Sequence, residues 1–270
     1  KIGLIGYGIV GKAIDFTVSE YFETVKYDKY QEQYNDFNVL KDCEFIFIAV
    51  PTPFDCKENK SNDSAVVEAL QKLQEINFNN IVIVKSTIAP GRCAFYKKEF
   101  NLNIVFNPEF LRESTTPNED FKNQHIIVIG NDNEEQYLKT ESFFKKFCRE
   151  DAKYFNTSTT EAEMIKCCQN TMLASRVAVA NMIYDACQKM GVNYENIREV
   201  AFKPFDIIGP HMTMVPGPDG KRGYGGKCLP KDIRALGSVC DSKLIRELIN
   251  YNDGLRDDLG TFMDNWDNEN

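Results

Sequence analysis

The feature that most constrains the fold is a change of pattern near residue 157. Before it, short apolar runs alternate with amphipathic segments such as residues 64–76 and 134–147. The apolar runs predict six strands, within KIGLIGYG, TVKYD, FIFIAVP, IVIVKST, NIVFNPE and HIIVIG. Near-continuous Val and Ile runs are typical of parallel strands that helices cover on both faces. Residues 1–156 are therefore expected to form a doubly wound α/β domain with a parallel sheet.

From residue 157 to Gly191 the chain contains no strand-like run and no proline. Thr160 followed by Glu163 fits a capping box, and Gly191 fits the end of a helix. The pattern predicts one helix of about 30 residues, well above the usual ~11–12. Because its middle is apolar or small on nearly every side, either a helical domain or a dimer interface must bury it. We expect residues 157–270 to form a helical domain built on this long central helix.

Composition argues against several classes of function. The net charge of −8 disfavours a broad surface for nucleic acid or for an anionic membrane. No apolar run reaches the ~18 residues of a membrane span. Nine cysteines without a C-x-x-C pair, and only two histidines, predict no metal site and reduced thiols in the cytoplasm. Six cysteines are expected to be small core residues: Cys43, Cys148, Cys167, Cys168, Cys187 and Cys240.

The sequence GYGIVG at residues 6–11 is a G-x-G-x-x-G turn between the first predicted strand and a helix. Gly6 permits the tight turn, Gly8 lets a pyrophosphate approach the backbone, and Gly11 lets the helix pack on the strand. The first N–H groups of that helix, around Ile9 and Val10, would face the phosphates.

Asp28 ends the second predicted strand, 22 residues after Gly6. A carboxylate in that place accepts hydrogen bonds from ribose hydroxyls and repels a 2′-phosphate, so we expect NAD rather than NADP. Turn, spacing and acid together favour a Rossmann-like dinucleotide site over a plain tight turn with a surface aspartate.

Cys228 lies in PDGKRGYGGKCLPKD, residues 218–232, a segment rich in glycine, proline and charge. Lys227 and Lys231 flank the cysteine, and Pro230 fits the first turn of a helix. Nearby cations and a helix N-terminus both favour a thiolate, which a nucleophilic cysteine requires. Asp232 is a candidate base or orienting group. An exposed loop thiol with incidental charges fits this segment equally well.

Polar residues follow two other predicted strands. Ser86 and Thr87 follow IVIVK, and ligands of open α/β sheets bind beyond the carboxyl ends of the strands. Glu109 and Glu113 follow the next strand, where they could also be merely solvated.

Lys166 and Asn170 are four residues apart in the predicted long helix and therefore share one face. A lysine on an apolar helix is costly unless it snorkels to solvent, pairs with an acid or has a function, and snorkelling is the usual outcome.

Taken in order along the chain, GYGIVG, VPTP, KSTIAPG, NPEFLRE, AEMIKCCQN and GYGGKCLPKD resemble the motifs of the UDP-glucose/GDP-mannose dehydrogenase family. The matches cover most of the chain, and NPEFLRE with GYGG-x-C-x-P-K-D is a very specific pair. The resemblance implies NAD-dependent, four-electron oxidation of the C6 alcohol of a nucleotide sugar to a carboxylate. UDP-glucose, giving UDP-glucuronate, is the default substrate, and GDP-mannose and UDP-N-acetyl sugars are alternatives.

The resemblance also implies catalytic roles. Cys228 would attack the aldehyde to form a thiohemiacetal, which the second oxidation converts to a thioester that water hydrolyses. Lys166 and Asn170 would stabilise the oxyanion, typically by about 3–4 kcal/mol per donor. Asp232 would transfer protons with a bound water that Thr87 holds.

Further contacts follow from the same resemblance. Glu109 would be the general base in thioester hydrolysis. The cofactor would be bound by Thr52, Ser86, Thr87, Glu113 and Lys231 in addition to the glycine turn and Asp28. The sugar nucleotide would be bound by Glu109, Phe110, Leu111, Arg112, Lys166, Asn170, Arg222, Tyr224 and Gly225. The long helix matches the dimerisation helix of the family, so we expect a homodimer through residues 160–190.

Three departures from the family pattern matter, of which one is Gln33, where the family often has a lysine or arginine near the adenosine, so NAD affinity could suffer. The family normally continues into a second α/β domain that closes over the nucleotide, so this chain is expected to be a natural short form or a fragment. Without that domain, uridine binding should be weak and water incompletely excluded. Ile207 stands where the family has an arginine that reaches a pyrophosphate across the dimer. We expect Arg222 or His211 to replace it, although a solvated hairpin at Asp219–Gly220 fits nearly as well.

Two other functions remain open. A β-hydroxyacid dehydrogenase shares the plan of an α/β domain with a long helix and uses a helix lysine, but it needs no cysteine, so GYGGKC argues against it. A truncated relative that binds NAD without turnover is the second. The intact set of catalytic residues argues against this one: Thr87, Glu109, Lys166, Asn170, Cys228 and Asp232.

Overall fold

The computed structural model describes residues 1–55, 60–111 and 116–256. The chain divides into two compact units, and the long helix α6 (Thr159–Met190) contributes to both. Unit 1 comprises residues 1–52 and 61–166, and unit 2 comprises residues 53–60 and 167–270. Strand β9 (Lys153–Thr157) and the first turns of α6 therefore belong to unit 1. The domain boundary that the sequence suggests after residue 156 stays a prediction.

Unit 1 is built on a seven-stranded sheet, as far as the chain is described, with the order β2-β1-β3-β6-β7-β8-β9. All six predicted strands are confirmed: β1 (Ile2–Ile5), β2 (Thr24–Tyr27), β3 (Phe45–Ile48), β6 (Ile81–Val84), β7 (Asn103–Phe106) and β8 (Ile126–Gly130). The strands from β2 to β7 pair in parallel. β8 runs antiparallel to β7 and parallel to β9. The sequence did not predict β9, because this half-exposed edge strand lacks a continuous apolar run.

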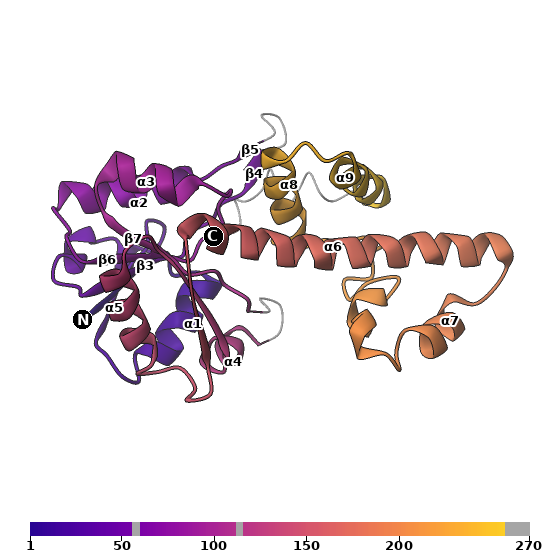
Figure 1. The fold of residues 1–270 in the computed structure, drawn as a ribbon, viewed down its shortest axis with the longest axis horizontal. Coiled ribbons are helices and arrows are strands. Elements are labelled where there is room, and N and C mark those ends of the chain that lie inside the picture. Colours follow the sequence, from indigo (N-terminus) through magenta and orange to yellow (C-terminus); the bar gives the residue numbers. More distant parts are fainter. Residues whose placement is uncertain (56–59, 112–115, 257–270) are drawn as a thin grey trace. The chain divides into compact units, whose positions relative to one another are not determined.

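Helices cover both faces of this sheet (Figure 1). One face carries α2 (Ser64–Glu75) and α3 (Arg92–Phe100), and the other carries α1 (Ile9–Val18), α4 (Pro117–Lys122) and α5 (Glu134–Phe144). Successive residues of each strand serve the two cores in turn. In β3, Ile46 and Ile48 pack in the core of α2 and α3, whereas Phe45 and Phe47 pack in the core of α1 and α5. This burial on both faces confirms the doubly wound arrangement.

The start of α6 differs from the prediction in detail. The capping box is formed by Ser158 and Glu161, not by Thr160 and Glu163. The N–H of Ser158 donates to Glu161 Oε2 at 2.8 Å, and the N–H of Glu161 donates to Ser158 Oγ at 3.2 Å. Both pairs have the required spacing, and the one that lies at the true helix start makes the bonds.

Glu163 has a different task, because its carboxylate is buried against the N-terminus of α3. It accepts hydrogen bonds from the backbone N–H of Gly91 at 2.5 Å and of Cys93 at 2.7 Å. Burial raises the pKa of Glu163 and outweighs these two bonds. Within unit 1, the first turns of α6 are thereby tied to the turn that follows β6.

Unit 2 contains the rest of α6 together with α7 (Tyr194–Ala201), α8 (Leu229–Val239) and α9 (Lys243–Leu255). Strand β4 (Phe54–Asp55), which pairs with β5 (Lys60–Ser61), also belongs to it. Gly191 ends α6 with a φ of +68°, as predicted. A small core joins Ala174 and Ala178 of α6 to Tyr224, Ile233 and partly buried residues of α9.

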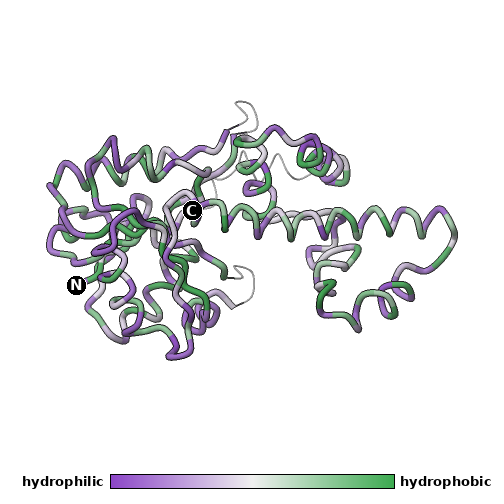
Figure 2. The backbone as a smooth tube through the Cα atoms, viewed as in Figure 1, coloured by the Kyte–Doolittle hydropathy of each residue, from purple (hydrophilic) through white to green (hydrophobic). Residues whose placement is uncertain are grey.

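Not all of α6 is covered in the single chain. Hydrophobic and hydrophilic residues alternate along it (Figure 2), and Met172, Val179 and Met182 are exposed. Cys168 is exposed as well, so its prediction as a core residue is wrong, whereas Cys167 and Cys187 are buried. Within the described ranges, no helix is both long and apolar enough to cross a membrane.

Candidate active site

The glycine turn joins β1 to α1, where the strand order reverses between β1 and β3. Gly6 has a φ of +88°, and a Cβ on Gly11 would lie 2.1 Å from the carbonyl oxygen of Gly6. Gly8 is different, because a Cβ there would meet nothing within 4 Å. Gly8 is also the N-cap of α1 and supplies no capping side chain. The first N–H groups of the helix, around Ile9 and Val10, are therefore suited to an anionic ligand.

Asp28 lies against this turn, as the spacing predicts. Its carboxylate accepts from the backbone N–H of Tyr7, the middle residue of GYG, at 2.7 Å and from that of Tyr30 at 2.9 Å. The side chain of Gln31 donates to the carbonyl of Tyr7 at 3.2 Å. The acid at the end of β2 and the turn at the end of β1 therefore form one structure.

Sequence reasoning missed Asp15, a buried carboxylate of α1 that supports the same turn. Asp15 accepts from the hydroxyls of Tyr7 and Thr24, both at 2.6 Å, and lies 3.1 Å from Nζ of Lys26. Burial opposes its charge, but the hydrogen bonds from Thr24, Tyr7 and Lys26 together hold the pKa of Asp15 below its usual value. The signal that could have identified Asp15 is the presence of an acidic residue on the buried, apolar face of the helix that follows the glycine turn.

Asp15→Asn is expected to lower the free energy of unfolding by about 2 kcal/mol at pH 7, because hydrogen bonds to a charged group are lost. A carboxyl with a lowered folded-state pKa stabilises the fold above its unfolded pKa of ~3.9 and loses that contribution as the pH falls further. The difference between Asp15→Asn and the parent should therefore shrink below about pH 4. Urea unfolding of both proteins at pH 7 and pH 3 measures it, and an equal difference at both pH values would contradict the assignment.

The polar residues after β3 and β6 lie together. The hydroxyl of Thr52 donates to the carbonyl of Thr87 at 2.5 Å. The hydroxyl of Ser86 accepts from the N–H of Val50 at 2.9 Å and donates to the carbonyl of Val50 at 2.7 Å. Thr52 and Ser86 are buried and brace the two loops, while Thr87 is half-buried. The three predicted residues therefore come together at the carboxyl edge of the sheet.

Glu109 lies in the loop after β7, and its own loop holds the carboxylate. Oε1 accepts from the N–H groups of Phe110 at 2.8 Å and Leu111 at 3.0 Å, and Oε2 lies 2.8 Å from Nζ of Lys85. Lys85 begins the KSTIAPG motif, but its position in that motif alone did not mark it as functional. The predicted residues Arg112 and Glu113 lie outside the described ones.

Lys166 is buried in α6 rather than snorkelling. Only 7% of it is exposed, and its Nζ lies 5.5 Å from the centroid of the Phe110 ring, within reach of a cation–π interaction. A buried lysine with an aromatic face beside it is costly to keep, so it calls for a function. Asn170, one helical turn further on, is buried as well.

Cys228 is the N-cap of α8, half-buried, and Pro230 lies in the first turn, as predicted. Asp232 is fully buried: its Oδ1 lies 2.6 Å from Nζ of Lys231, and its Oδ2 accepts from the side-chain amide of Asn170. Burial works against the charge of Lys231, but the nearby Asp232 and Cys228 together raise its pKa above the ordinary value. Unit 2 thus brings a thiol, a buried ion pair and an amide together.

The GYGG loop before Cys228 is anchored from beneath. Tyr224 is a buried core residue whose N–H donates to Asn252 Oδ1 at 2.7 Å and whose carbonyl accepts from the Asn252 side-chain amide at 3.0 Å. Gly225 has no room for a side chain, because a Cβ there would lie 2.5 Å from the guanidinium of Arg256. Arg256 in turn donates to Asp219 at 2.8 Å. Sequence reasoning missed both Asn252 and Arg256.

Arg222, the predicted phosphate ligand, is bound to α6. Its Nη2 lies 2.6 Å from Asp185 Oδ1, and its guanidinium lies 5.1 Å from the centroid of the Tyr184 ring. Ile207, in the place of the family arginine, is 84% exposed, and His211 is exposed too. Arg222 is therefore available in unit 2 as a cation, but its guanidinium already pairs with Asp185.

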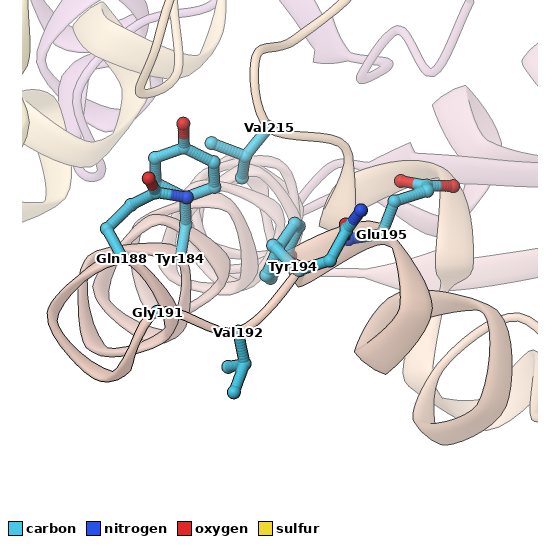
Figure 3. A pocket seen from close by; sticks show the side chains of 8 residues that line it. Tyr184, Gln188, Gly191, Val192, Tyr194, Glu195 and Val215 are labelled. Carbon is cyan, nitrogen blue, oxygen red and sulfur yellow. The ribbon is translucent and has the colours of Figure 1, made fainter.

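A cavity of about 530 Å³ lies elsewhere in unit 2, at the end of α6 (Figure 3). It is lined by Tyr184, Gln188, Gly191, Val192, Asn193, Tyr194, Glu195 and Val215. None of the predicted site residues is among them. The candidate functional residues therefore lie in two groups, at the strand ends of unit 1 and around α8 in unit 2, and not in this cavity.

The doubly wound sheet, the glycine turn at its switch point and the adjoining acid define a protein of the Rossmann type, the class in which such a turn binds a dinucleotide. Models of two domains match the chain: the NAD binding domain of the UDP-glucose/GDP-mannose dehydrogenase family over residues 9–148, and the central domain of that family over residues 160–253. The chain belongs to the UDP-glucose/GDP-mannose dehydrogenase family.

Among curated proteins, the chain is 33% identical over 252 residues to the UDP-glucose 6-dehydrogenase of Rickettsia felis. That match covers 87% of this chain and 54% of the relative, so the chain spans about half the length of the curated relatives it matches. Among solved structures, a UDP-D-ManNAc dehydrogenase of Pyrococcus horikoshii has a TM-score of 0.80 at 20% identity, over 94% of this chain and 68% of that one. This likeness shows the fold.

A 3-hydroxyisobutyrate dehydrogenase of Mycobacterium tuberculosis also shares the fold, with a TM-score of 0.72 over 96% of this chain and 94% of that one. Its 13% identity shows the fold alone. The shared fold explains why a β-hydroxyacid dehydrogenase was an alternative interpretation of the sequence. The matching family models favour the UDP-glucose/GDP-mannose dehydrogenase family instead.

Proposed function

We propose that the chain oxidises the C6 alcohol of a nucleotide sugar to a carboxylate with two NAD, through a thioester on Cys228. The observation that carries this proposal is the group around α8, in which Cys228 occupies the N-cap position and the buried pair of Lys231 and Asp232 lies in the first turn. A buried lysine and aspartate are costly to keep, and a hydroxyacid dehydrogenase would have no use for a thiol beside them. Family membership supplies the reaction class.

NAD fits the residues of unit 1. The space beside Gly8 and the uncapped start of α1 suit a pyrophosphate, and Asp28 suits ribose hydroxyls. When bound, NAD supplies the acceptor for each hydride. Thr52, Ser86, Thr87, Glu113 and Lys231 are proposed as further cofactor contacts.

The residues of the chain carry the other steps. The alcohol loses a proton and a hydride to give the aldehyde, and the Cys228 sulfur then adds to the carbonyl carbon. Lys166 and Asn170 stabilise the oxyanion that forms, since a buried cation and an amide donor are suited to developing negative charge. Asp232 takes up and returns protons. After loss of a second hydride the adduct is a thioester, which water cleaves to the acid and the free thiol while Glu109 accepts a proton from that water.

The sugar donor is proposed to be UDP-glucose, with GDP-mannose and UDP-N-acetyl sugars as alternatives. Backbone groups of Phe110, Leu111, Arg112 and Gly225 would line the sugar site. Incubation of the chain with NAD and each of the three donors, with NADH followed by absorbance and the acid by mass spectrometry, tests the proposal. Acid from one donor supports it, whereas NAD binding without acid from any donor would favour a relative without turnover.

Arg222 is proposed to bind the phosphates of the sugar nucleotide after exchanging Asp185 for them. Arg222→Ala is then expected to weaken sugar-nucleotide binding about tenfold, roughly 1.4 kcal/mol. Asp185→Ala is the matched control, because it breaks the same ion pair but leaves the guanidinium in place. Calorimetric titration with UDP-glucose measures both. Equal losses in the two variants, or no loss in Arg222→Ala, would reduce the ion pair to a structural contact.

A second copy of the chain is proposed to cover the exposed apolar residues of α6. Met172, Val179 and Met182 recur at intervals of seven and three residues, so they lie on one side of the helix. A molar mass of two chains by light scattering would agree with this homodimer, and a mass of one chain would exclude it.

A further inference from the structure

Lys85 is a buried charged residue of the carboxyl edge for which the proposed mechanism has no use. Its side chain is completely buried at the end of β6. Burying an ammonium group costs free energy unless partners surround it, and an apolar side chain of similar size often serves stability as well or better. Stability alone therefore does not explain a lysine in this place.

The partners of Lys85 come from the neighbouring strand and loop. Its Nζ donates to Asn107 Oδ1 at 2.7 Å, lies 2.8 Å from Glu109 Oε2, and lies 5.3 Å from the centroid of the Phe121 ring. The amide of Asn107 donates in turn to the carbonyl of Val128 in β8 at 2.7 Å. The lysine at the end of β6 is therefore held by two residues that follow β7, and one of these, Asn107, is bound to β8.

This cluster lies where the sheet is most weakly joined. β7 and β8 share a single paired position, Phe106 with Gly130, and the Asn107 amide adds a side-chain link across the same junction. Glu109 lies only two residues after Asn107. The cluster therefore holds the first residues of the loop that carries the Glu109 carboxylate.

The two oxygens of Glu109 are not equivalent. Oε1 accepts two backbone N–H groups, which fill the two lone pairs of a carboxylate oxygen. Oε2 is buried and touches the Lys85 ammonium, yet among the described residues no donor is aligned to make a hydrogen bond to it. A buried carboxylate oxygen with unfilled hydrogen-bonding capacity calls for a partner such as water.

We propose that Lys85 is a positioning residue that holds Glu109 so that only Oε2 can accept a hydrogen bond from the water that cleaves the thioester. The inference rests on the proposed function, in which Glu109 is the base of that step. Because the side chain of Lys85 is completely buried, it is not exposed to sugar or cofactor, and its effect is confined to the final hydrolysis. When Lys85 is replaced and the Glu109 carboxylate is misplaced, Cys228 is still acylated at its normal rate, but the thioester is hydrolysed slowly.

Lys85→Met, which keeps the length and removes the charge, tests the proposal beside Glu109→Gln. In both variants the first turnover should give two NADH per chain at near the parent rate. Steady-state turnover should fall about 100-fold or more, the range of a lost general base. Intact-mass spectrometry should find the sugar acyl group on Cys228. A loss of the first-turnover NADH in Lys85→Met, or unchanged steady-state turnover, would overturn the proposal. Lys97→Met is the control, since it removes a different lysine–carboxylate pair of unit 1, that of Lys97 with Asp132, and should leave both phases unchanged.

A readout without turnover separates this inference from the proposed function. The N–H groups of Phe110 and Leu111 are bound by Glu109 Oε1, so Lys85→Met should speed their hydrogen exchange, whereas Lys97→Met should not. If the parent protein forms no NADH with any donor, the proposed function fails, and faster exchange still shows that Lys85 positions Glu109. Unchanged exchange in Lys85→Met would overturn the positioning itself.

Discussion

Replacing Cys228 with serine is expected to lower acid formation by about 10³-fold or more, the size of effect seen when an enzyme loses its nucleophile. A serine hydroxyl remains protonated at neutral pH and is a far weaker nucleophile than a thiolate. The surroundings of the cysteine are otherwise kept, because the substitution leaves the N-cap of α8 and the pair of Lys231 with Asp232 in place. The acid product is measured by mass spectrometry and NADH by absorbance.

Cys168→Ser is the matched control for this result. Cys168 is exposed on α6 and is not among the proposed catalytic or ligand-binding residues, so its conservative change to serine should leave acid formation unchanged. Equal activity of Cys228→Ser and Cys168→Ser would show that no thioester is formed on Cys228.

Gly8→Ala and Gly11→Ala are expected to fail in different ways, although both change the same turn by one methyl group. A Cβ at Gly11 would lie 2.1 Å from the backbone oxygen of Gly6, so the turn must shift, and overpacking of this kind costs about 1–3 kcal/mol of unfolding free energy. A Cβ at Gly8 meets no protein atom within 4 Å, and its backbone is extended, so the fold should tolerate it. The methyl group would instead occupy the space of the pyrophosphate.

The measurement combines urea unfolding with calorimetric titration of NAD. Gly8→Ala should keep the stability of the parent and lose about 100-fold in NAD affinity, roughly 2.7 kcal/mol. Gly11→Ala should lose both stability and affinity. If Gly8→Ala binds NAD as the parent does, the turn is not the phosphate site.

Much of unit 1 could be predicted because its signals are local. Residues such as Ile46 and Phe47 of β3 are apolar in succession, since both faces of the sheet are covered, and this produces the continuous runs that predicted the strands. The glycines and Asp28 could be placed for the same reason, because a turn with a fixed geometry requires them at fixed spacing.

The rest depended on contacts that no local pattern reveals. Thr160 and Glu163 have the spacing of a capping box, but Glu163 binds α3, which lies about 70 residues earlier in the chain. Lys85 looks like an ordinary polar strand end until Asn107 and Glu109 are seen around it. Asp15 was missed in a similar way, because its partners include Thr24 and Lys26 on the next strand.

The loop before Cys228 shows the same limit in unit 2. The sequence identified the GYGG turn, but not the support beneath it from Asn252 and Arg256, which follow it by about 30 residues. It also suggested Arg222 as a phosphate ligand without the information that Asp185 of α6 already pairs with it. Charged residues such as Arg222 could be recognised in the sequence, whereas partners such as Asp185 were recognised only in the structure.

The most direct test of the account is the amount of NADH formed per molecule of UDP-glucose consumed by the parent protein. Oxidation of the alcohol to the acid removes four electrons, so we expect two NADH for each sugar and the acid as the product. One NADH for each sugar, with an aldehyde as the product, would mean a simple alcohol dehydrogenase and would contradict the proposed role of Cys228.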